Sequence, residues 1–397
     1  MSSAVPEGWE LSPLSSLADY KNGRAFKPSD WSKSGLPILR IAQINNPHKV
    51  EDYYDGNDIN DGHFITKGDL IFSWSATLKA EIWSHYDAVL NQHIFKVTEK
   101  VGTNRSYLQQ LLDYAIPKLA ESSHGSTMKH IKKGVLDEFF SPVPPLLEQK
   151  KIASILTSVD EVIENTQKQI DKLQDLKKAT MNELLTKGIG HTEFKDSELG
   201  RIPASWGVVS LDKVCKVRQG LQIPIRDRLK GAATGRYPYL TVSWINSKFD
   251  IDKAEFIANP NDSVVLKSNE FVVGRTGAVG QIFDGLECVF HNNFFAVSLL
   301  SDSVEKEFLK HFLKWHTTQD LLLKLAGSTT IPDLNHGDFY SINVGLPPVE
   351  EQCRVVSQVD SIDTTLREIR LKLNALMSLK KSLMQDLLTG KVRVTVN

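Results

Sequence analysis

The chain carries an internal repeat with a period of about 200 residues, and this repeat limits its architecture more than any other feature. The sharpest match closes each copy: residues 176–186 read LKKATMNELLT, and residues 379–389 read LKKSLMQDLLT. Weaker matches pair residues 5–9 with 202–206 and residues 125–127 with 327–329. A solenoid uses repeats of roughly 20–50 residues, so this period is too long for one. It predicts two copies of a whole domain, each followed by a long helix.

The first part of each copy, about 140 residues, mixes short strand-like runs with turns. Residues 69–75 and 270–276 form one such pair of runs, and residues 89–97 and 289–297 form a second. Their β-branched and aromatic residues, flanked by Gly, Asn and Asp, are typical of strands. One amphipathic helix is expected to close each part, over 105–120 and 304–326. Each globule is therefore predicted to be α+β.

The second part of each copy is a predicted long helix that follows a pair of prolines, a residue tolerated at a helix start. Apolar residues then recur at intervals of three and four, with one slip at Leu176, and the pattern repeats 203 residues later, where Leu379 matches Leu176. This is the pattern of a coiled-coil seam over four to five heptads. The predicted seam contains Leu156, Val159, Ile163, Ile170 and Leu173, then Val359, Ile362, Leu366, Leu373 and Leu376.

Two equivalent apolar stripes in one chain favour burial against each other. With a globule between them, the simplest solution is an antiparallel coiled coil and a pseudo-two-fold molecule. Two alternatives remain open: each helix packs on its own globule, or the helices drive homodimerisation. The expected boundaries are residues 1–146 for the first globule, 147–188 for the first helix, 189–346 for a connector and the second globule, and 347–397 for the second helix and tail.

The sequence offers little that could catalyse a reaction. It has no Gly-x-x-x-x-Gly-Lys-Ser/Thr loop and no Asn/Asp-Pro-Pro-Tyr/Phe segment of the adenine methyltransferases. Cys215, Cys288 and Cys353 fit no zinc spacing, and Glu148-Gln149-Lys150 matches only half of a nuclease motif. We therefore expect no catalytic residue and no metal. Without an apolar run of about 18 residues or a signal-peptide pattern, a cytoplasmic protein is expected.

Basic residues gather at equivalent places in the two copies, between residues 21 and 40 and between 213 and 236. Solvated loop charge is the ordinary interpretation of such clusters, but paired patches favour nucleic acid, whose phosphates need cations. Turns 73–79 and 124–133 of the first copy, with turns 274–279 and 326–336 of the second, are predicted to approach DNA. The candidate contacts are Arg24, Lys27, Ser73, Trp74, Lys79, Lys129, Lys132, Arg218, Arg226, Arg228, Arg275, Thr276, Ser328 and Thr329.

Arg275 is the first of these candidates, because arginine donates two hydrogen bonds to guanine; a structural role at the end of a strand is the alternative. The whole chain has a net charge of −1, which is unusual for a protein that binds DNA alone. Either the basic residues are locally concentrated, or a partner supplies much of the contact with the DNA backbone.

The order of these features resembles the specificity subunit of type I restriction–modification systems. The resemblance rests on residues 5–9, Gly68-Asp69-Leu70-Ile71-Phe72-Ser73, Leu90-Asn91-Gln92-His93, residues 125–127, Pro144-Pro145-Leu146-Leu147-Glu148-Gln149 and residues 387–392. It covers essentially the whole chain. The second copy departs from the pattern at Asn269, where glycine is usual, and lacks a match for Lys129-His130.

The resemblance implies that the globules are two target recognition domains, each reading half of a bipartite site in double-stranded DNA. It implies that the helices are a spacer that docks two methyltransferase subunits, through which restriction/translocase subunits join. S-adenosylmethionine, ATP and Mg are then expected only on those partners, with none in this chain and no membrane contact. Two other hypotheses are a coiled-coil adaptor that never touches DNA and a nuclease with an unrecognised site.

Overall fold

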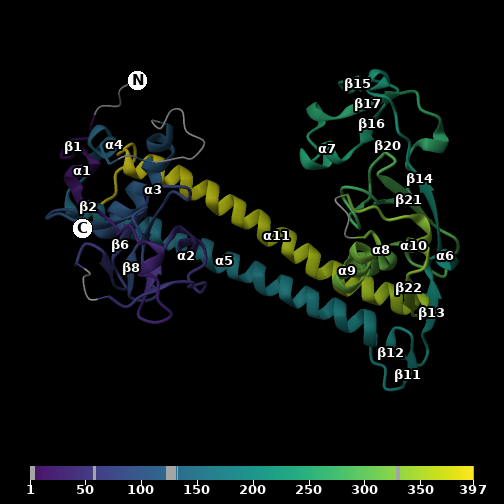
Figure 1. The fold of residues 1–397 in the computed structure, drawn as a ribbon. Coiled ribbons are helices and arrows are strands. Elements are labelled where there is room, and N and C mark those ends of the chain that lie inside the picture. The colour runs from purple at the N-terminus through teal and green to yellow at the C-terminus, as the bar shows by residue number, and fades with distance from the viewer. Residues whose placement is uncertain (1–4, 57–59, 122–130, 132, 328–330, 397) are drawn as a thin grey trace. The chain divides into compact units, whose positions relative to one another are not determined.

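The computed structural model describes residues 5–56, 60–121, 131, 133–327 and 331–396 (Figure 1). These residues form two compact units. Unit 1 contains residues 1–168 and 371–397, and unit 2 contains residues 169–370. Both long helices contribute to both units, because each passes from one unit into the other.

Unit 1 is built on two four-stranded sheets and a two-stranded ribbon. The first sheet has the order β2 (Ala18–Asn22), β9 (Ile94–Glu99), β6 (Leu70–Ser73), β7 (Lys79–Ile82). The second has the order β4 (Tyr53–Tyr54), β3 (Leu36–Leu39), β8 (Ala88–Leu90), β5 (Phe64–Ile65). The ribbon pairs β1 (Glu10–Pro13) with β10 (Phe140–Val143), and the globule's helices are α1 (Leu14–Leu17), α2 (Ile41–Asn45), α3 (Arg105–Glu121) and α4 (Val135–Glu138).

Unit 2 repeats this plan except in its second sheet, where Leu229–Lys230 forms an additional edge strand and Val265, at the place of β5, makes only an isolated bridge to Val289. Its sheets have the orders β14 (Cys215–Gln219), β21 (Phe294–Leu299), β18 (Phe271–Gly274), β19 (Ile282–Phe283) and β15 (Leu229–Lys230), β17 (Glu255–Ala258), β16 (Arg236–Leu240), β20 (Val289–Phe290). Its ribbon pairs β13 (Gly207–Ser210) with β22 (Asn343–Leu346), and its helices are α6 (Leu211–Val214), α7 (Val242–Asn246), α8 (Lys306–Lys314), α9 (His316–Leu325) and α10 (His336–Tyr340). A hairpin of β11 (Phe194–Ser197) and β12 (Gly200–Pro203) precedes it. The predicted α+β class and duplication are confirmed.

The prediction of one strand over 89–97, and of its equivalent over 289–297, is wrong. Each run divides into two strands that join different sheets, β8 and β9 in unit 1 and β20 and β21 in unit 2. A tight turn separates them: the amide of Ile94 donates to the Asn91 carbonyl, and the amide of Phe294 donates to the His291 carbonyl. The polar Asn-Gln-His and His-Asn-Asn triplets form these turns, as short polar residues commonly do.

The single helix predicted over 304–326 is also wrong, whereas its counterpart α3 is one helix. Trp315 is extended, with φ −62° and ψ 135°, and divides the segment into α8 and α9. Two β-branched residues, Thr317 and Thr318, follow the break. Both lie inside α9, so they do not account for the break; the amide of Gln319 donates to the Trp315 carbonyl at 2.8 Å, which begins the new helix.

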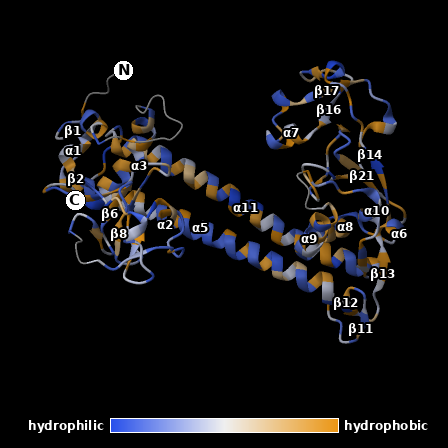
Figure 2. Ribbon diagram, in the orientation of Figure 1, coloured by the Kyte–Doolittle hydropathy of each residue, from blue (hydrophilic) through white to orange (hydrophobic). Residues whose placement is uncertain are grey.

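The predicted long helices are present. Helix α5 (Leu146–Lys187) has 42 residues and α11 (Val349–Leu388) has 40. Figure 2 shows apolar residues recurring among hydrophilic ones along both helices. Each helix begins directly after its proline pair, as expected for a residue that lacks an amide hydrogen.

The two helices pair with each other antiparallel in both units. In unit 1, the ammonium of Lys380 on α11 lies 2.6 Å from a carboxylate oxygen of Asp160 on α5. In unit 2, Lys177 on α5 forms the equivalent ion pair with Asp363 on α11, also at 2.6 Å. The intramolecular pairing predicted from the repeat is confirmed.

The helix ends also complete the cores of the globules, so the alternative that each helix packs on a globule is partly right. The core of unit 1 contains Ile152 and Leu156 from the start of α5, with Leu387 and Leu388 from the end of α11. The core of unit 2 repeats the arrangement with Val355 and Val359 from the start of α11 and with the end of α5. Each core therefore needs residues from both helices.

The observed seam differs from the predicted one at Leu176, where the spacing of apolar residues is irregular, and at the matching Leu379. Leu176 and Leu379 are 50% and 49% exposed. The stripe instead continues from Leu173 through Lys177 to the buried Met181, and the same holds 203 residues later. Lys177 is half-buried because its ammonium is neutralised by Asp363 while its stem covers apolar surface. The prediction considered apolar residues alone, and it therefore placed Leu176 in the seam instead of its neighbour Lys177.

The Glu-Gln pair at the start of each helix fixes that helix to its globule. Gln149 accepts a hydrogen bond from the Asn104 amide at 2.8 Å and donates to two backbone carbonyls. Glu148 accepts from the indole of Trp9 at 3.1 Å and pairs with Arg393. Because Glu148 is committed to these contacts, its match to half of a nuclease motif has a structural explanation.

Gln352 repeats the pattern in unit 2, and its substitution tests this function. It is fully buried, accepts from the Glu305 amide at 2.8 Å, and donates to the carbonyls of Ser303 and Pro347 at 2.9 and 2.8 Å. Gln352→Ala leaves these backbone groups unsatisfied, at about 1–3 kcal/mol each when buried. We expect a loss of about 3–5 kcal/mol in the free energy of unfolding, measured by urea denaturation. Gln358→Ala, on the exposed face of α11, should change it by less than about 0.5 kcal/mol, and an equal effect of the two would contradict this reading.

Candidate nucleic-acid interface

The two turns predicted to approach DNA from unit 2 lie against each other. The turn after β18 contains Arg275 and Thr276, and the segment before α10 contains Asp333 and Leu334. The amide of Leu334 donates to the Arg275 carbonyl at 3.1 Å, and Thr276 and Asp333 form an isolated β-bridge. A third segment joins them, because the Arg275 amide donates to the carbonyl of Asn293 at 2.7 Å.

We call these three joined segments, around Arg275, Asn293 and Leu334, a frame. Unit 1 builds the same frame with different side chains. The amide of Trp74, after β6, donates to the His93 carbonyl at 3.3 Å, and the Trp74 carbonyl accepts from the Ile131 amide at 2.9 Å. Trp74 therefore corresponds to Arg275, His93 to Asn293 and Ile131 to Leu334. The predicted matching of the turns is confirmed for the described residues, while their contact with DNA stays a prediction.

Glycines make the turn after β18 possible. A Cβ on Gly274 would overlap the carbonyl oxygen of Ala278, so a side chain cannot be accommodated there without rearrangement. Gly277 and Gly280 both have φ +73°, in the left-handed region that glycine tolerates best. The glycine run is thus explained by a tight turn, which also leaves the side chains of Arg275 and Thr276 partly exposed.

A polar hollow adjoins the frame in unit 1. It has a volume of 590 Å³ and is lined by Tyr20, Lys21, Asn22, Asn60, Asp61, Gly62, His63 and Lys133. Asn22 links the hollow to the frame, because its side-chain oxygen accepts from the Trp74 indole at 3.2 Å. The ring of Trp74 also lies edge-on to His93, with centroids 5.3 Å apart. Lys21 and Lys133 give the hollow two cations of the kind that contact phosphates, beside the carboxylate of Asp61.

Asp113 on α3 holds the strand that follows the Trp74 turn of unit 1. Its carboxylate accepts from the Ala80 amide at 3.0 Å, at the start of the strand that follows the 73–79 turn. Burial raises the pKa of Asp113 to about 6, and the hydrogen bond from Ala80 opposes the rise. The ionised form of this carboxyl therefore carries a desolvation cost at neutral pH.

Substituting Asp113 should make unit 1 less sensitive to pH. The pKa of an unfolded Asp is about 4, so the folded state binds the proton more tightly and stability falls as the pH rises from about 4 to about 6. The full effect is about 2–3 kcal/mol. Asp113→Asn keeps an oxygen for the Ala80 amide and cannot ionise. We expect the difference in unfolding free energy, variant minus wild type, to grow by this amount between pH 4 and pH 7; a constant difference would contradict the raised pKa.

Three arginines that were predicted to contact DNA bind other residues of their own unit. The guanidinium of Arg218 pairs with Glu270 at 2.6 Å and bonds to the Ser263 carbonyl. Arg228 pairs with Glu255 at 2.8 Å and lies over the Tyr239 ring. In unit 1, Arg24 donates to the Tyr54 hydroxyl at 2.9 Å and lies 3.7 Å from Asp30. These contacts favour a role in the fold for all three arginines.

The remaining predicted residues differ in exposure. Lys27, Lys79 and Arg226 are exposed, the last with 84% of its side chain, whereas Ser73 is fully buried. Lys129, Lys132, Ser328 and Thr329 lie outside the described residues.

Three potential metal ligands, His311, Asp360 and Asp363, lie together in unit 2. His311 Nε2 lies 2.8 Å from an Asp360 carboxylate oxygen, and Asp363 is already paired with the Lys177 ammonium. At the equivalent position of unit 1, Gln110 donates to Asp160 at 2.7 Å. Asp160 is the counterpart of Asp363 rather than of Asp360, so the two units use different aspartates, but in each a polar side chain of the globule bonds to an aspartate of a long helix. The clustering of these three residues is thus explained by contacts within the protein, without a metal centre.

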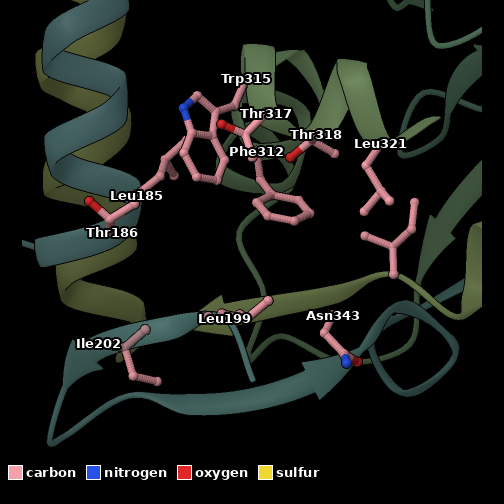
Figure 3. Close-up of a pocket in the computed structure, with 12 residues that line it drawn as sticks. Leu185, Thr186, Leu199, Ile202, Phe312, Trp315, Thr317, Thr318, Leu321 and Asn343 are labelled. Atoms are coloured by element: carbon pink, nitrogen blue, oxygen red, sulfur yellow. The ribbon is translucent and has the colours of Figure 1, made fainter. Parts of the chain in front are cut away.

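An apolar pocket of 260 Å³ lies in unit 2, and none of its lining residues belongs to these turns (Figure 3). Phe312, Trp315 and Leu321 of the α8–α9 segment face Leu199 and Ile202 of the β11–β12 hairpin across it. No charged side chain lines it, so it offers nothing to a phosphate. Among the described residues, no helix has both the length and the apolar character that a membrane span requires.

Sequence reasoning found Arg275 and Trp74 but missed Asp333, Asn22, His93 and Asn293 as members of the frame. Asp333 is 58 residues from Arg275, and His93 is part of a run predicted to be one strand. For His93 and Asn293 the sequence did contain a signal. Each lies in a polar triplet that interrupts the strand-like composition of residues 89–97 or 289–297.

A family model described as the type I restriction modification DNA specificity domain matches residues 6–175 and 203–376. The MjaVIII specificity subunit of a type I restriction enzyme from Methanocaldococcus jannaschii is 27% identical, over 98% of this chain and 94% of the relative. The EcoBI specificity subunit from Escherichia coli is 24% identical, over 98% of this chain and 86% of the relative.

Solved structures share the fold. The S subunit of a type I restriction–modification system from M. genitalium covers 100% of this chain with a TM-score of 0.59 and 16% identity. A chain from a study of the assembly and conformational transition of a type I system covers 98%, with a TM-score of 0.59 and 17% identity.

Proposed function

The chain belongs to the family of type I restriction–modification DNA specificity subunits, and from this premise we propose that its two units read the two halves of a bipartite target in double-stranded DNA. Members of this family supply DNA specificity and are non-catalytic. Unit 1 would present the frame around Trp74 to one half-site, and unit 2 the frame around Arg275 to the other.

The observation that carries this proposal is the pair of equivalent frames with unlike side chains. A common backbone arrangement at corresponding turns supports a shared function. The exchange of an indole for a guanidinium changes which base edges can be contacted. Phosphate contacts position a protein on DNA, and base contacts specify the sequence.

The net charge of −1 supports a complex in which partners share the DNA contact. We propose two methyltransferase subunits docked on the polar faces of α5 and α11, with restriction/translocase subunits joining through them in the cytoplasm. S-adenosylmethionine, ATP and Mg would belong to those partners.

The test is to express the chain with its methyltransferase and to map methylated adenines across the host DNA. A bipartite motif with a fixed gap is the expected result, and the methyltransferase alone should leave no such motif. Methylation independent of this chain would instead favour an adaptor that does not read DNA.

A further inference from the structure

We infer that Asp333 is a positioning residue, which holds Arg275 so that the free edge of its guanidinium can recognise one guanine in the half-site read by unit 2. This inference rests on the proposed function and adds to it a base, a reading residue and the support of that residue.

The guanidinium of Arg275 has one edge occupied and one edge open. Its Nε donates to Asp333 Oδ1 at 2.9 Å, and its Nη2 donates to Asp333 Oδ2 at 2.8 Å. Arginine has five N–H donors in a rigid plane, so this pair uses two of them. Of the three others, one on Nη1 and one on Nη2 lie on the Nη1–Nη2 edge, and the third, on Nη1, points along the side nearest Cδ; no partner for them is found among the described residues. Two parallel donors on one edge match the O6 and N7 acceptors of guanine.

Asp333 is itself held in place from several directions. The Thr276 hydroxyl donates to its carboxylate, and its amide donates to the Ala326 carbonyl at 3.0 Å. The next residue, Leu334, bonds to the Arg275 carbonyl and is fully buried. Arg275 and Asp333 therefore stand on two segments whose backbones are joined, and the guanidinium orientation is fixed before DNA arrives. Such preorganisation lowers the entropy that an arginine loses on binding.

The charges also favour a paired role for Asp333. Its side chain is 43% exposed, beside turns that are proposed to face a polyanion. An unpaired carboxylate there would be repelled by the phosphates. The adjacent Arg275 lowers the pKa of Asp333, so the carboxylate stays ionised and the pair persists at neutral pH.

Among the described residues of unit 1, no paired arginine stands at the same place. Trp74 occupies the corresponding position, and its indole N–H donates to Asn22. An indole has a single donor and cannot make the bidentate contact. The structure therefore assigns the guanine contact of this turn to one half-site only.

The test uses the complex of the full chain with its methyltransferase, and selects binding sites from duplex DNA randomised over the target. The variants are Arg275→Ala, Arg275→Lys, Asp333→Ala, Asp333→Asn and the double exchange Arg275→Asp with Asp333→Arg. We expect Arg275→Ala to lower the preference for guanine at one position by about 5- to 150-fold. The Asp333 variants should lower it at that same position by about 2- to 12-fold. Preferences in the half-site read by unit 1 should not change.

The double exchange distinguishes two roles of the ion pair: positioning the guanidinium for guanine, and merely holding the two segments together. It re-forms an ion pair across them but moves the guanidinium to the wrong segment, so the guanine preference should stay lost while thermal stability recovers. Arg275→Lys keeps the charge and should weaken the preference, because an ammonium can donate to guanine but lacks the planar fork that fixes both hydrogen bonds. Asp363→Asn, which removes a carboxylate from an ion pair on α11 of the same unit, should leave every base preference intact.

The inference is overturned if the double exchange restores the guanine preference, or if the Asp333 variants weaken all base pairs equally. It is also overturned if the wild-type complex selects a bipartite site whose preferences none of the variants alters. A wild-type complex that selects no sequence at all would instead remove the proposed function, on which the inference depends.

Discussion

A chain that ends after Pro348 is expected to leave both units without a complete core. Helix α11 supplies Met384, Leu387 and Leu388 to the core of unit 1 and Val355 and Val359 to that of unit 2. Each of these side chains contributes about 1.5–3 kcal/mol when fully buried, and the whole stability of a domain is about 5–15 kcal/mol. The apolar stripe of α5 would also face water. We expect aggregation on expression, or no complex with the methyltransferase, measured by size-exclusion chromatography.

Two comparisons show whether the loss comes from the core. A chain that ends after Gly390 keeps α11 and loses only the tail, including Arg393, which pairs with Glu148. It should fold with a stability lower by about 1–3 kcal/mol. Leu388→Glu, at a fully buried position, should reproduce the defect of the long truncation, whereas Leu379→Glu, at a position 49% exposed, should be tolerated. A soluble chain ending at Pro348 that still assembled with two methyltransferases would show that neither core depends on α11.

The repeat predicted the fold well because its information is local. Helix limits follow from proline pairs and from periodicity, and the 203-residue correspondence transfers each assignment from one copy to the other. The failures occur where tertiary contacts override that pattern. Lys177 takes a seam position because Asp363, on the partner helix, neutralises it. The break at Trp315 likewise depends on the packing of α8 and α9, which composition does not reveal.

The candidate interface was predictable only in part, for a related reason. Arg275 can be found from residue type and from its position after a strand, since arginine is the commonest reader of guanine. Its dependence on Asp333 cannot, because the two residues meet only after the chain between them has folded. The Glu-Gln pairs illustrate the same limit: their recurrence is visible in sequence, but their contacts with backbone groups are not.

Exchange of residues 204–340 for the matching segment of the MjaVIII relative is expected to replace one half-site and to leave the other intact. The exchanged segment contains the Arg275 frame and the sheets of unit 2, but neither the Trp74 frame nor α5 and α11. Each mismatched base pair costs about 1–3 kcal/mol, roughly additively. Three changed pairs should therefore reduce binding to the original site by at least about 100-fold. Methylation mapping in cells that express the exchanged chain with the methyltransferase measures the new motif.

Lengthening the helices is the matched change, because it leaves both frames untouched. Seven residues inserted after Lys168 and seven after Leu371, at positions related by the repeat, keep the seam in phase and add about 10 Å to each helix. That length corresponds to about three base pairs, over which DNA also rotates by about 100°. A simple extension therefore turns one unit away from its half-site, and we expect loss of binding rather than acceptance of a longer gap. Methylation at any remaining sites should show both original half-site sequences. An insertion that rewrote a half-site would show that α5 and α11 take part in reading bases, and the assignment of reading to the frames would fail.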